Sequence, residues 1–257
     1  MMKARPFMLS ETDWKTVRET SFTTAILPWG ATEAHNYHLP YGTDNYQVEY
    51  VTERAAEAAW ARGARLLVLP GIPFGVNTGQ MDIAFCMNMM PSTQLAILKD
   101  CCEVLVRHGV SRLIIANGHG ANQFIPIIRE LAGLYPQLFI CTLNWFQAAD
   151  RKAFFTEPGD HADEFETSVM MHIAPELVHP LSRAGDGATK RFTPEGFRKG
   201  WAWAQRPWSK VTADTGSGDP RLATPEKGAA FTDATIRNMA DFFHDVATLP
   251  YDALFEA

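Results

Sequence analysis

Several features that would point to particular classes of protein are missing from this sequence. No apolar run approaches the roughly 20 residues needed to cross a bilayer, and the first six residues lack the apolar core of a secretory signal. Basic residues are in the minority, since 23 Lys and Arg stand against 29 Asp and Glu for a net charge of -6. That balance offers no positive field to nucleic acid or to an anionic membrane. We expect a cytoplasmic protein with neither partner.

Cysteine is also scarce. The four residues Cys86, Cys101, Cys102 and Cys141 match neither a zinc-finger spacing nor a disulfide framework, so we expect free thiols buried in the fold. No low-complexity linker or internal repeat divides the chain, and hydrophobic residues make up 46% of it. This composition is typical of a globular protein with a substantial core. We predict a single domain over residues 1–257.

Segments with the patterns of strands and helices alternate along the chain. Strands are expected at 24–28, 65–69, 112–116 and 138–143, and helices at 47–62, 93–108, 163–173 and from Thr224 toward Phe243. Asn122 could cap a further helix that carries Pro126 in its first turn. This order predicts an α/β fold, a mostly parallel sheet with helices on both faces.

Potential metal ligands gather directly behind the first predicted strand. Glu33, His35 and Asp44 follow it closely, and Gly30 and Pro40 argue against a long helix there, so we expect all three ligands on a loop. Open α/β sheets bind their ligands at the carboxyl ends of the strands, where this loop begins. Two carboxylates and an imidazole suit zinc, manganese or iron(II), whereas an all-oxygen set would suit calcium or magnesium.

A glycine-rich turn at residues 117–122 should bring a second histidine to the same edge. It lies between a predicted strand and a predicted helix, and its glycines let the backbone approach a ligand while His119 projects into the crevice. Such a turn could instead cradle a phosphate. It has, however, neither the lysine of a Walker loop nor the three-glycine spacing of a dinucleotide fingerprint.

A third segment places His161 just before a helix that opens with three acidic residues. A structural reading is available, because Asp163 as N-cap with Glu166 three residues on forms a capping box. Glu164 and Glu166 are separated by roughly 200° around a helix, so they cannot both face one metal pocket. Three segments that all place histidine and carboxylate at strand ends favour a site for two metal ions.

The composition shifts between Pro180 and about Pro225 toward Gly, Pro, Asp, Thr and Trp. We expect a long loop region with short elements there. The clustered Trp201, Trp203 and Trp208 suit either a lid packed on the surface or a contact between subunits.

Taken together, these segments resemble the creatininase (creatinine amidohydrolase) family. The similar stretches are residues 27–30 continuing to 44, 117–122, 161–168 with 175–178, and 216–220 before 223–224. The resemblance implies an α/β fold, a dinuclear zinc, manganese or iron centre, and commonly a homohexamer. Carried over by position, Glu33 and His119 should hold one metal, His35 the other, and Asp44 should bridge the two.

One position departs from the pattern of creatininase itself. The residue two after the second-motif histidine is a glutamate ligand in that enzyme, and here it is Ala121. Either the second metal takes its missing carboxylate from Glu164 or Glu166, or it binds more weakly. We assign Glu164 to the metal and Glu166 to catalysis. The departure also argues against creatinine as the substrate.

The activity implied by the resemblance is metal-dependent hydrolysis of a carbon–nitrogen bond in a cyclic amide, a formamide or a small peptide-like substrate. Two cations would lower the pKa of a bridging water, and His161 is the candidate proton shuttle or oxyanion partner. His38 and Asn117 could orient ligands, and Trp145 could pack on the substrate. The alternative is a metal-stabilised oligomeric binding protein without turnover.

Overall fold

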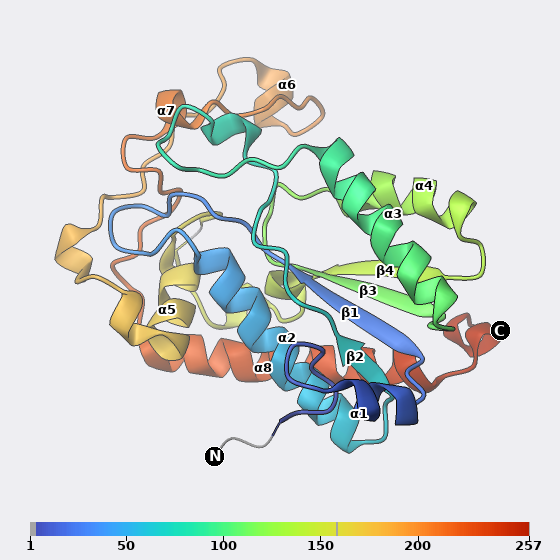
Figure 1. Ribbon diagram of the computed structural model, residues 1–257. Helices are drawn as coiled ribbons and strands as arrows, with labels where there is room; N and C mark the ends of the chain where they lie inside the picture. Colours follow the sequence, from blue (N-terminus) through green and yellow to red (C-terminus); the bar gives the residue numbers. More distant parts are fainter. Residues whose placement is uncertain (1–3, 158, 257) are drawn as a thin grey trace.

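A sheet of four parallel strands forms the centre of the protein (Figure 1). The computed structural model describes residues 4–157 and 159–256. In spatial order the strands are β2 (Leu66–Val68), β1 (Thr24–Trp29), β3 (Arg112–Asn117) and β4 (Phe139–Asn144). Thr24 pairs with Leu66 on one side and with Arg112 on the other, and all three strand pairs are parallel. The predicted parallel sheet is confirmed.

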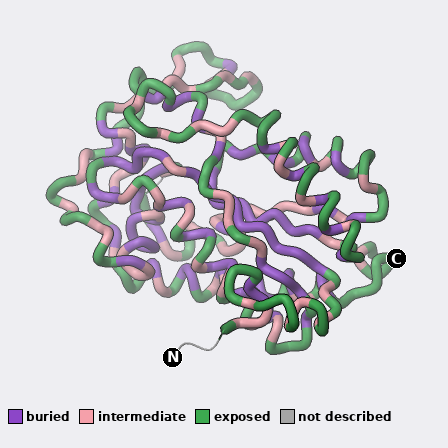
Figure 2. The backbone as a smooth tube through the Cα atoms, viewed as in Figure 1, coloured by how far each residue is buried: buried purple, intermediate pink, exposed green. Residues whose placement is uncertain are grey.

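The central strands are buried on both faces, which explains their composition. All six residues of β1 and five of the six in β3 are buried, and Figure 2 shows them in the interior of the molecule. A strand that is covered on both faces has a continuous apolar sequence rather than an alternating one. Ile114 and Ile115 accordingly point into two different apolar clusters on opposite faces.

Helices cover both faces of the sheet, as predicted (Figure 1). One face carries α2 (Thr43–Ala61), α5 (Glu164–Ile173) and α8 (Pro225–Thr248), and the other carries α3 (Pro91–Arg107) and α4 (Phe124–Leu134). The remaining α-helices are the short α1 (Trp14–Glu19), α6 (Glu195–Arg198) and α7 (Trp208–Val211).

Local sequence explains where two of these helices begin. The Asp163 carboxylate accepts the Glu166 N–H at 3.0 Å and so caps α5, while the Thr224 hydroxyl accepts the Lys227 N–H at 3.3 Å and caps α8. Pro225 occupies the first turn of α8, where its missing N–H costs nothing. The Asp163 N-cap was predicted from sequence, and so was the start of a helix at Thr224.

Two predictions about helix starts are wrong. α2 already begins at Thr43, so Asp44 lies in its first turn and not on the preceding loop. α4 begins after Gln123, and the Asn122 side chain does not cap it. Asn122 is buried instead, and its Oδ1 accepts the Val76 N–H at 3.0 Å. Pro126 does lie in the first turn of α4.

Residues 180–224 form the expected long loop region, interrupted by short helices. α6 and α7 lie at one end of the molecule (Figure 1), and α7 contacts the 3-10 helix η1 (Thr78–Gln80). Ser209 of α7 donates a hydrogen bond to Asp82 just beyond η1. Trp201 and Trp203 are 76% and 82% exposed.

Two further expectations concern thiols and membranes. The four cysteines are free; Cys102 is buried and the other three are partly buried. Among the described residues, no helix combines the length and the apolar character needed to cross a membrane.

Candidate metal centre

The turn after β3 lies directly against the first turn of α2 at the carboxyl edge of the sheet. Gly118 makes this approach possible, because a Cβ there would lie 2.8 Å from the Cβ of Val48 and 3.0 Å from the carbonyl oxygen of Asp44. Any larger residue would force the two segments apart. The contact brings His119 next to Asp44.

Glu33, Asp44 and His119 form one group of potential ligands. The Nδ1 atom of His119 lies 2.9 Å from Oε1 of Glu33 and 2.9 Å from Oδ2 of Asp44. On the other side of the ring, Nε2 lies 3.1 Å from the carbonyl oxygen of Val76. When Nε2 donates to that carbonyl, the lone pair of Nδ1 faces the two carboxylates. All three residues are buried.

His35, Asp44 and Glu166 form a second group. The Nε2 atom of His35 lies 3.2 Å from Oδ1 of Asp44 and 3.8 Å from Oε2 of Glu166, and its Nδ1 lies 3.0 Å from the carbonyl oxygen of Glu33. Asp44 therefore belongs to both groups, with one oxygen directed to each histidine. This is the arrangement of a bridging carboxylate.

The structure places Glu164 outside both groups, contrary to its assignment as a metal ligand. Its buried carboxylate accepts a hydrogen bond from the ammonium group of Lys227 and two more from the backbone N–H groups of Thr156 and Glu157, at 2.9 and 2.7 Å. Glu164 thus ties α5 to α8. Of the two alternatives, Glu166 is the one that faces the cluster, where it lies among the potential ligands. Its predicted catalytic role stays a prediction.

Three carboxylates and three imidazoles share this cluster. Within the described residues, the carboxylates of Glu33, Asp44 and Glu166 form ion pairs with imidazoles and with no Lys or Arg. Burial alone would lower the pKa of His35, but Asp44 and the other carboxylates raise it to about 10. Burial raises the pKa of Glu166 to about 8, with Asp44 adding to the effect and His35 opposing it.

Charge and donor type both fit a pair of divalent cations. Buried carboxylates are costly unless a cation compensates them, and the three imidazoles alone do so only when protonated. Mixed nitrogen and carboxylate donors suit zinc, manganese and iron. The residues present therefore fit a dinuclear metal group.

His161 lies beside both groups, and with Glu33 and His35 it forms a third group of potential ligands. Its Nδ1 is 3.8 Å from Oε1 of Glu33, and its Nε2 lies 2.8 Å from the carbonyl oxygen of Ala34. The ring stacks on that of His35 at a centroid distance of 4.1 Å and meets the edge of Trp208 at 4.7 Å. Burial, together with the nearby His35, lowers the pKa of His161.

Asn117 and His38 lie around the cluster without bonding to its ligand atoms. The Asn117 side chain accepts the His119 N–H at 3.1 Å and donates to the His119 carbonyl at 2.9 Å, so it braces the turn and not the ring. His38 Nε2 bonds to the Thr167 hydroxyl at 2.8 Å, next to Glu166. Burial lowers the pKa of His38 to about 4.

The expectation that Trp145 packs on substrate is wrong. It is fully buried in the core, where its ring lies 5.4 Å from that of Phe165. A cavity of about 850 Å³ opens over the metal-ligand cluster, and its aromatic lining includes Phe146, Trp203 and Trp208. Two of the clustered tryptophans thus line this cavity, Trp208 as a buried residue and Trp203 as a largely exposed one. Both the lid and the subunit contact stay predictions for residues 180–224.

Sequence reasoning missed Gln80, which donates a hydrogen bond from η1 to Oε2 of Glu33. No motif marks this glutamine. The phosphate-binding alternative for the glycine-rich turn loses support, because the N–H groups of Gly118 and His119 already donate to Trp29 and Asn117.

This site belongs to a known class of enzyme. The chain matches the family model Creatininase, described as creatinine amidohydrolase, over residues 10–243. It therefore belongs to the creatininase family of amidohydrolases, and the predicted class, a hydrolase of carbon–nitrogen bonds, is confirmed.

Three characterised relatives illustrate the range of the family. Creatinine amidohydrolase from Pseudomonas putida is 27% identical over 238 residues, which cover 84% of this chain and 86% of that protein. The 3-dehydro-scyllo-inosose hydrolase from Thermotoga maritima is 30% identical over 181 residues, 66% of this chain and 56% of the relative. A mycofactocin precursor peptide peptidase from Mycobacterium ulcerans is 28% identical over 226 residues, 81% and 80% of the two chains.

Solved structures agree with this placement. The crystal structure of a Bacteroides fragilis protein, provisionally named creatinine amidohydrolase, superposes with a TM-score of 0.92 at 41% identity and covers 99% of this chain and 100% of its own. A creatininase crystal structure at 22% identity has a TM-score of 0.82, with 97% and 100% covered, and shares the fold.

Proposed function

We propose that this protein is a metal-dependent amidohydrolase that holds two divalent cations per chain. The observation that carries the proposal is the position of Asp44, which belongs to two groups of potential ligands. One group also contains Glu33 and His119, and the other contains His35 and Glu166. Each of these two imidazoles has its second nitrogen against a backbone carbonyl. Metal-binding histidines are commonly oriented in this way.

Zinc and manganese are the cations that the relatives support. Of two solved creatininase structures with this fold, one is a mutant described as Zn-Zn type and the other is named as a manganese form. The nitrogen and oxygen donors here suit either ion, and they suit iron(II) as well. Glu166 supplies the carboxylate that Ala121 cannot, which supports a complete second site.

Cations bound to these residues would supply an ionised water near neutral pH and an electrophile for the amide carbonyl. The chain itself contributes proton transfer. The Nε2–H of His161 is committed to the Ala34 carbonyl, so Nδ1 is the atom that can carry a proton toward the leaving amine. The edge contact with Trp208 holds the ring in this orientation.

The substrate class remains that of a cyclic amide, a formamide or a small peptide-like molecule. A cavity of about 850 Å³ is of the size that small ligands occupy. The names of the relatives cover creatinine, an inosose and a precursor peptide. The single domain, the homohexamer and the cytoplasmic location stay predictions. Light scattering on the purified protein tests the homohexamer.

Metal content per chain tests the proposal. Elemental analysis of protein prepared without chelator should find two metals in the wild type, none in Asp44→Ala and one in Glu33→Ala. The reason is that a bridging ligand serves both ions, whereas Glu33 serves one. Retention of two metals by Asp44→Ala would contradict the ligand assignment.

The competing interpretation is a metal-stabilised binding protein without turnover. It predicts one metal or none in the wild type and no release of amine from any amide or formamide offered. The presence of Glu166 in the second group supports the hydrolase, because it removes the gap in the ligand set on which this alternative depended.

A further inference from the structure

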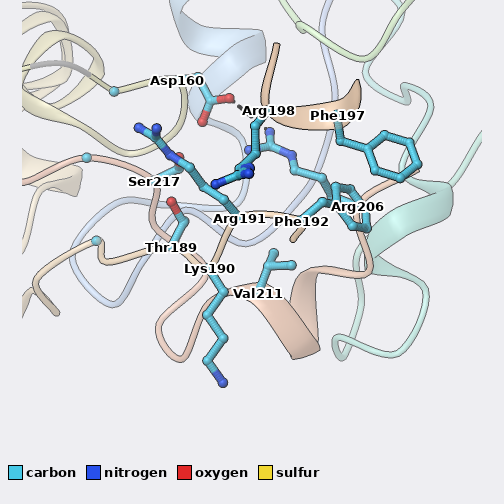
Figure 3. Close-up of a pocket in the computed structure, with 13 residues that line it drawn as sticks. Asp160, Thr189, Lys190, Arg191, Phe192, Phe197, Arg198, Arg206, Val211 and Ser217 are labelled. Atoms are coloured by element: carbon cyan, nitrogen blue, oxygen red, sulfur yellow. Dashed lines mark ion pairs between the residues drawn. The ribbon is translucent and has the colours of Figure 1, made fainter. Parts of the chain in front are cut away.

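A second cavity, of about 520 Å³, lies beside the one over the metal-ligand cluster (Figure 3). We call it the arginine pocket. It is formed by the segment before α5 and by parts of the 180–224 segment. Its charged lining residues are Asp160, Lys190, Arg191, Arg198 and Arg206.

The charge of this pocket is opposite to that of the whole protein. Four cationic side chains face a single carboxylate there, while the full chain carries a net charge of -6. Arg206 pairs with Asp160 at 3.0 Å. Across residues 4–157 and 159–256, Lys190, Arg191 and Arg198 form no ion pair. A local positive potential on an acidic protein attracts an anion selectively to that place.

Three arginines lie in the same part of this pocket. In Figure 3 the side chains of Arg191, Arg198 and Arg206 lie around Asp160, while Lys190 extends away. Planar guanidinium groups bind carboxylate and phosphate oxygens through pairs of hydrogen bonds. Phe192 adds an apolar wall to the same pocket.

The arginine pocket borders the proposed reaction site. Asp160 and Arg206 line both cavities. The guanidinium of Arg206 lies 4.8 Å from the ring centre of Trp208, whose edge in turn contacts His161. The two cavities are therefore neighbours, and a molecule long enough to reach past Asp160 and Arg206 would place one end at the arginines and the other beside His161.

We propose that the arginine pocket binds an oxyanionic group of the substrate, a carboxylate or a phosphate ester. The substrate is then an amide with a negatively charged tail and not a neutral one. This inference rests on the proposed hydrolase function of the neighbouring cavity, and it narrows the substrate class that the metal-ligand cluster alone leaves open.

Matched ligands test the inference on the full-length, metal-loaded protein. N-formyl-6-aminohexanoate carries a carboxylate on a chain long enough to join the two cavities, N-formyl-6-aminohexanamide is its neutral counterpart, and N-formyl-6-aminohexyl phosphate carries a phosphate ester. Calorimetry gives the Kd of each ligand, and formate release gives kcat and KM. The variant is the double replacement Arg191→Gln and Arg198→Gln. Both arginines are exposed, so their loss should leave the fold intact.

Arg129→Gln is the control, because this exposed arginine lies on α4 on the other face of the sheet. Wild type and control should bind a charged ligand at least about tenfold more tightly than the neutral one, the effect of one or two charged hydrogen bonds. The double variant should lose that preference. The tighter of the two charged ligands identifies carboxylate or phosphate as the source.

The two proposals fail in different ways. Equal binding of charged and neutral ligands by the wild type, no binding of either charged ligand, or a preference that survives in the double variant overturns the arginine pocket, even when formate is released. Preferential anion binding that the double variant loses supports the pocket. If no formate accompanies that binding, the hydrolase proposal fails for these substrates while the pocket stands.

Discussion

Replacing Glu166 with glutamine should remove one metal ion per chain, whereas replacing Glu164, two residues earlier, should remove none. The two carboxylates lie on the same helix but face different partners. Glu166 is one of three donors in the group with His35 and Asp44. Glu164 is bound to Lys227 and to backbone N–H groups. The pair is a matched test, because each variant exchanges one carboxylate for a neutral amide of nearly equal size.

The expected size of the effect follows from the number of donors. Loss of a group that merely orients a ligand typically lowers metal affinity by about 10- to 100-fold. Since Glu166 itself is a proposed ligand, Glu166→Gln should weaken the second site by more than about 100-fold, while the Glu33 and His119 site keeps its ion. Glu164→Gln should instead lower the free energy of unfolding by about 1.5–3 kcal/mol, because hydrogen bonds to a charged group are lost.

Elemental analysis after dialysis against a competing chelator measures the first effect, and chemical denaturation measures the second. We expect one metal and near-normal stability in Glu166→Gln, and two metals with reduced stability in Glu164→Gln. The reasoning would be refuted if Glu166→Gln kept both ions or if Glu164→Gln lost one.

Three further predictions follow from the same contacts. Burial alone would raise the pKa of Glu164, but hydrogen bonds from Lys227 and from backbone N–H groups lower it below its ordinary value of 4.5. The stability that the ionised Glu164 contributes is therefore complete above pH 4.5 and is lost on acidification. The difference in the free energy of unfolding between wild type and Glu164→Gln should accordingly shrink as denaturation is measured toward about pH 3. Asn122→Ala should lower metal affinity by about 10- to 100-fold in a metal titration, because Asn122 holds the backbone segment that orients His119; unchanged affinity would exclude this positioning role. Ala121→Glu added to Glu166→Gln should restore the second metal in elemental analysis, since both positions line the same cavity, and a count that stays at one would show that they are not equivalent.

The sheet and its ligand-bearing edge could be predicted from sequence for a simple reason. Parallel strands buried on both faces have continuous apolar sequences, and their carboxyl ends meet at one edge. Once β1 and β3 were recognised, Glu33, His35 and His119 had to lie near one another. The loop prediction for Asp44 failed only because α2 begins immediately after the glycine at position 42.

Side-chain direction on α5 could not be predicted from sequence. Helical spacing shows that Glu164 and Glu166 point apart, but the phase of the helix is fixed by packing against α8. The partner of Glu164 is Lys227, 63 residues away in the chain. The prediction for Trp145 failed for a related reason. A tryptophan after a strand can point toward the cavity or into the core, and here Trp145 packs in the core against Phe165.

A carboxylate ligand on α5 has a contact near His161 that a carboxylate on the glycine-rich turn would lack. The Ala162 N–H donates to Oε2 of Glu166, so the same carboxylate that faces His35 and Asp44 also holds the peptide that follows His161. An ion bound at Glu166 would therefore fix the residue proposed to carry the proton, whereas a glutamate at position 121 would have no such connection. In this chain Ala121 stands where creatininase has a glutamate, and the proposed ligand is Glu166 on α5. Under the proposal, completion of the second metal site is therefore linked to the orientation of His161.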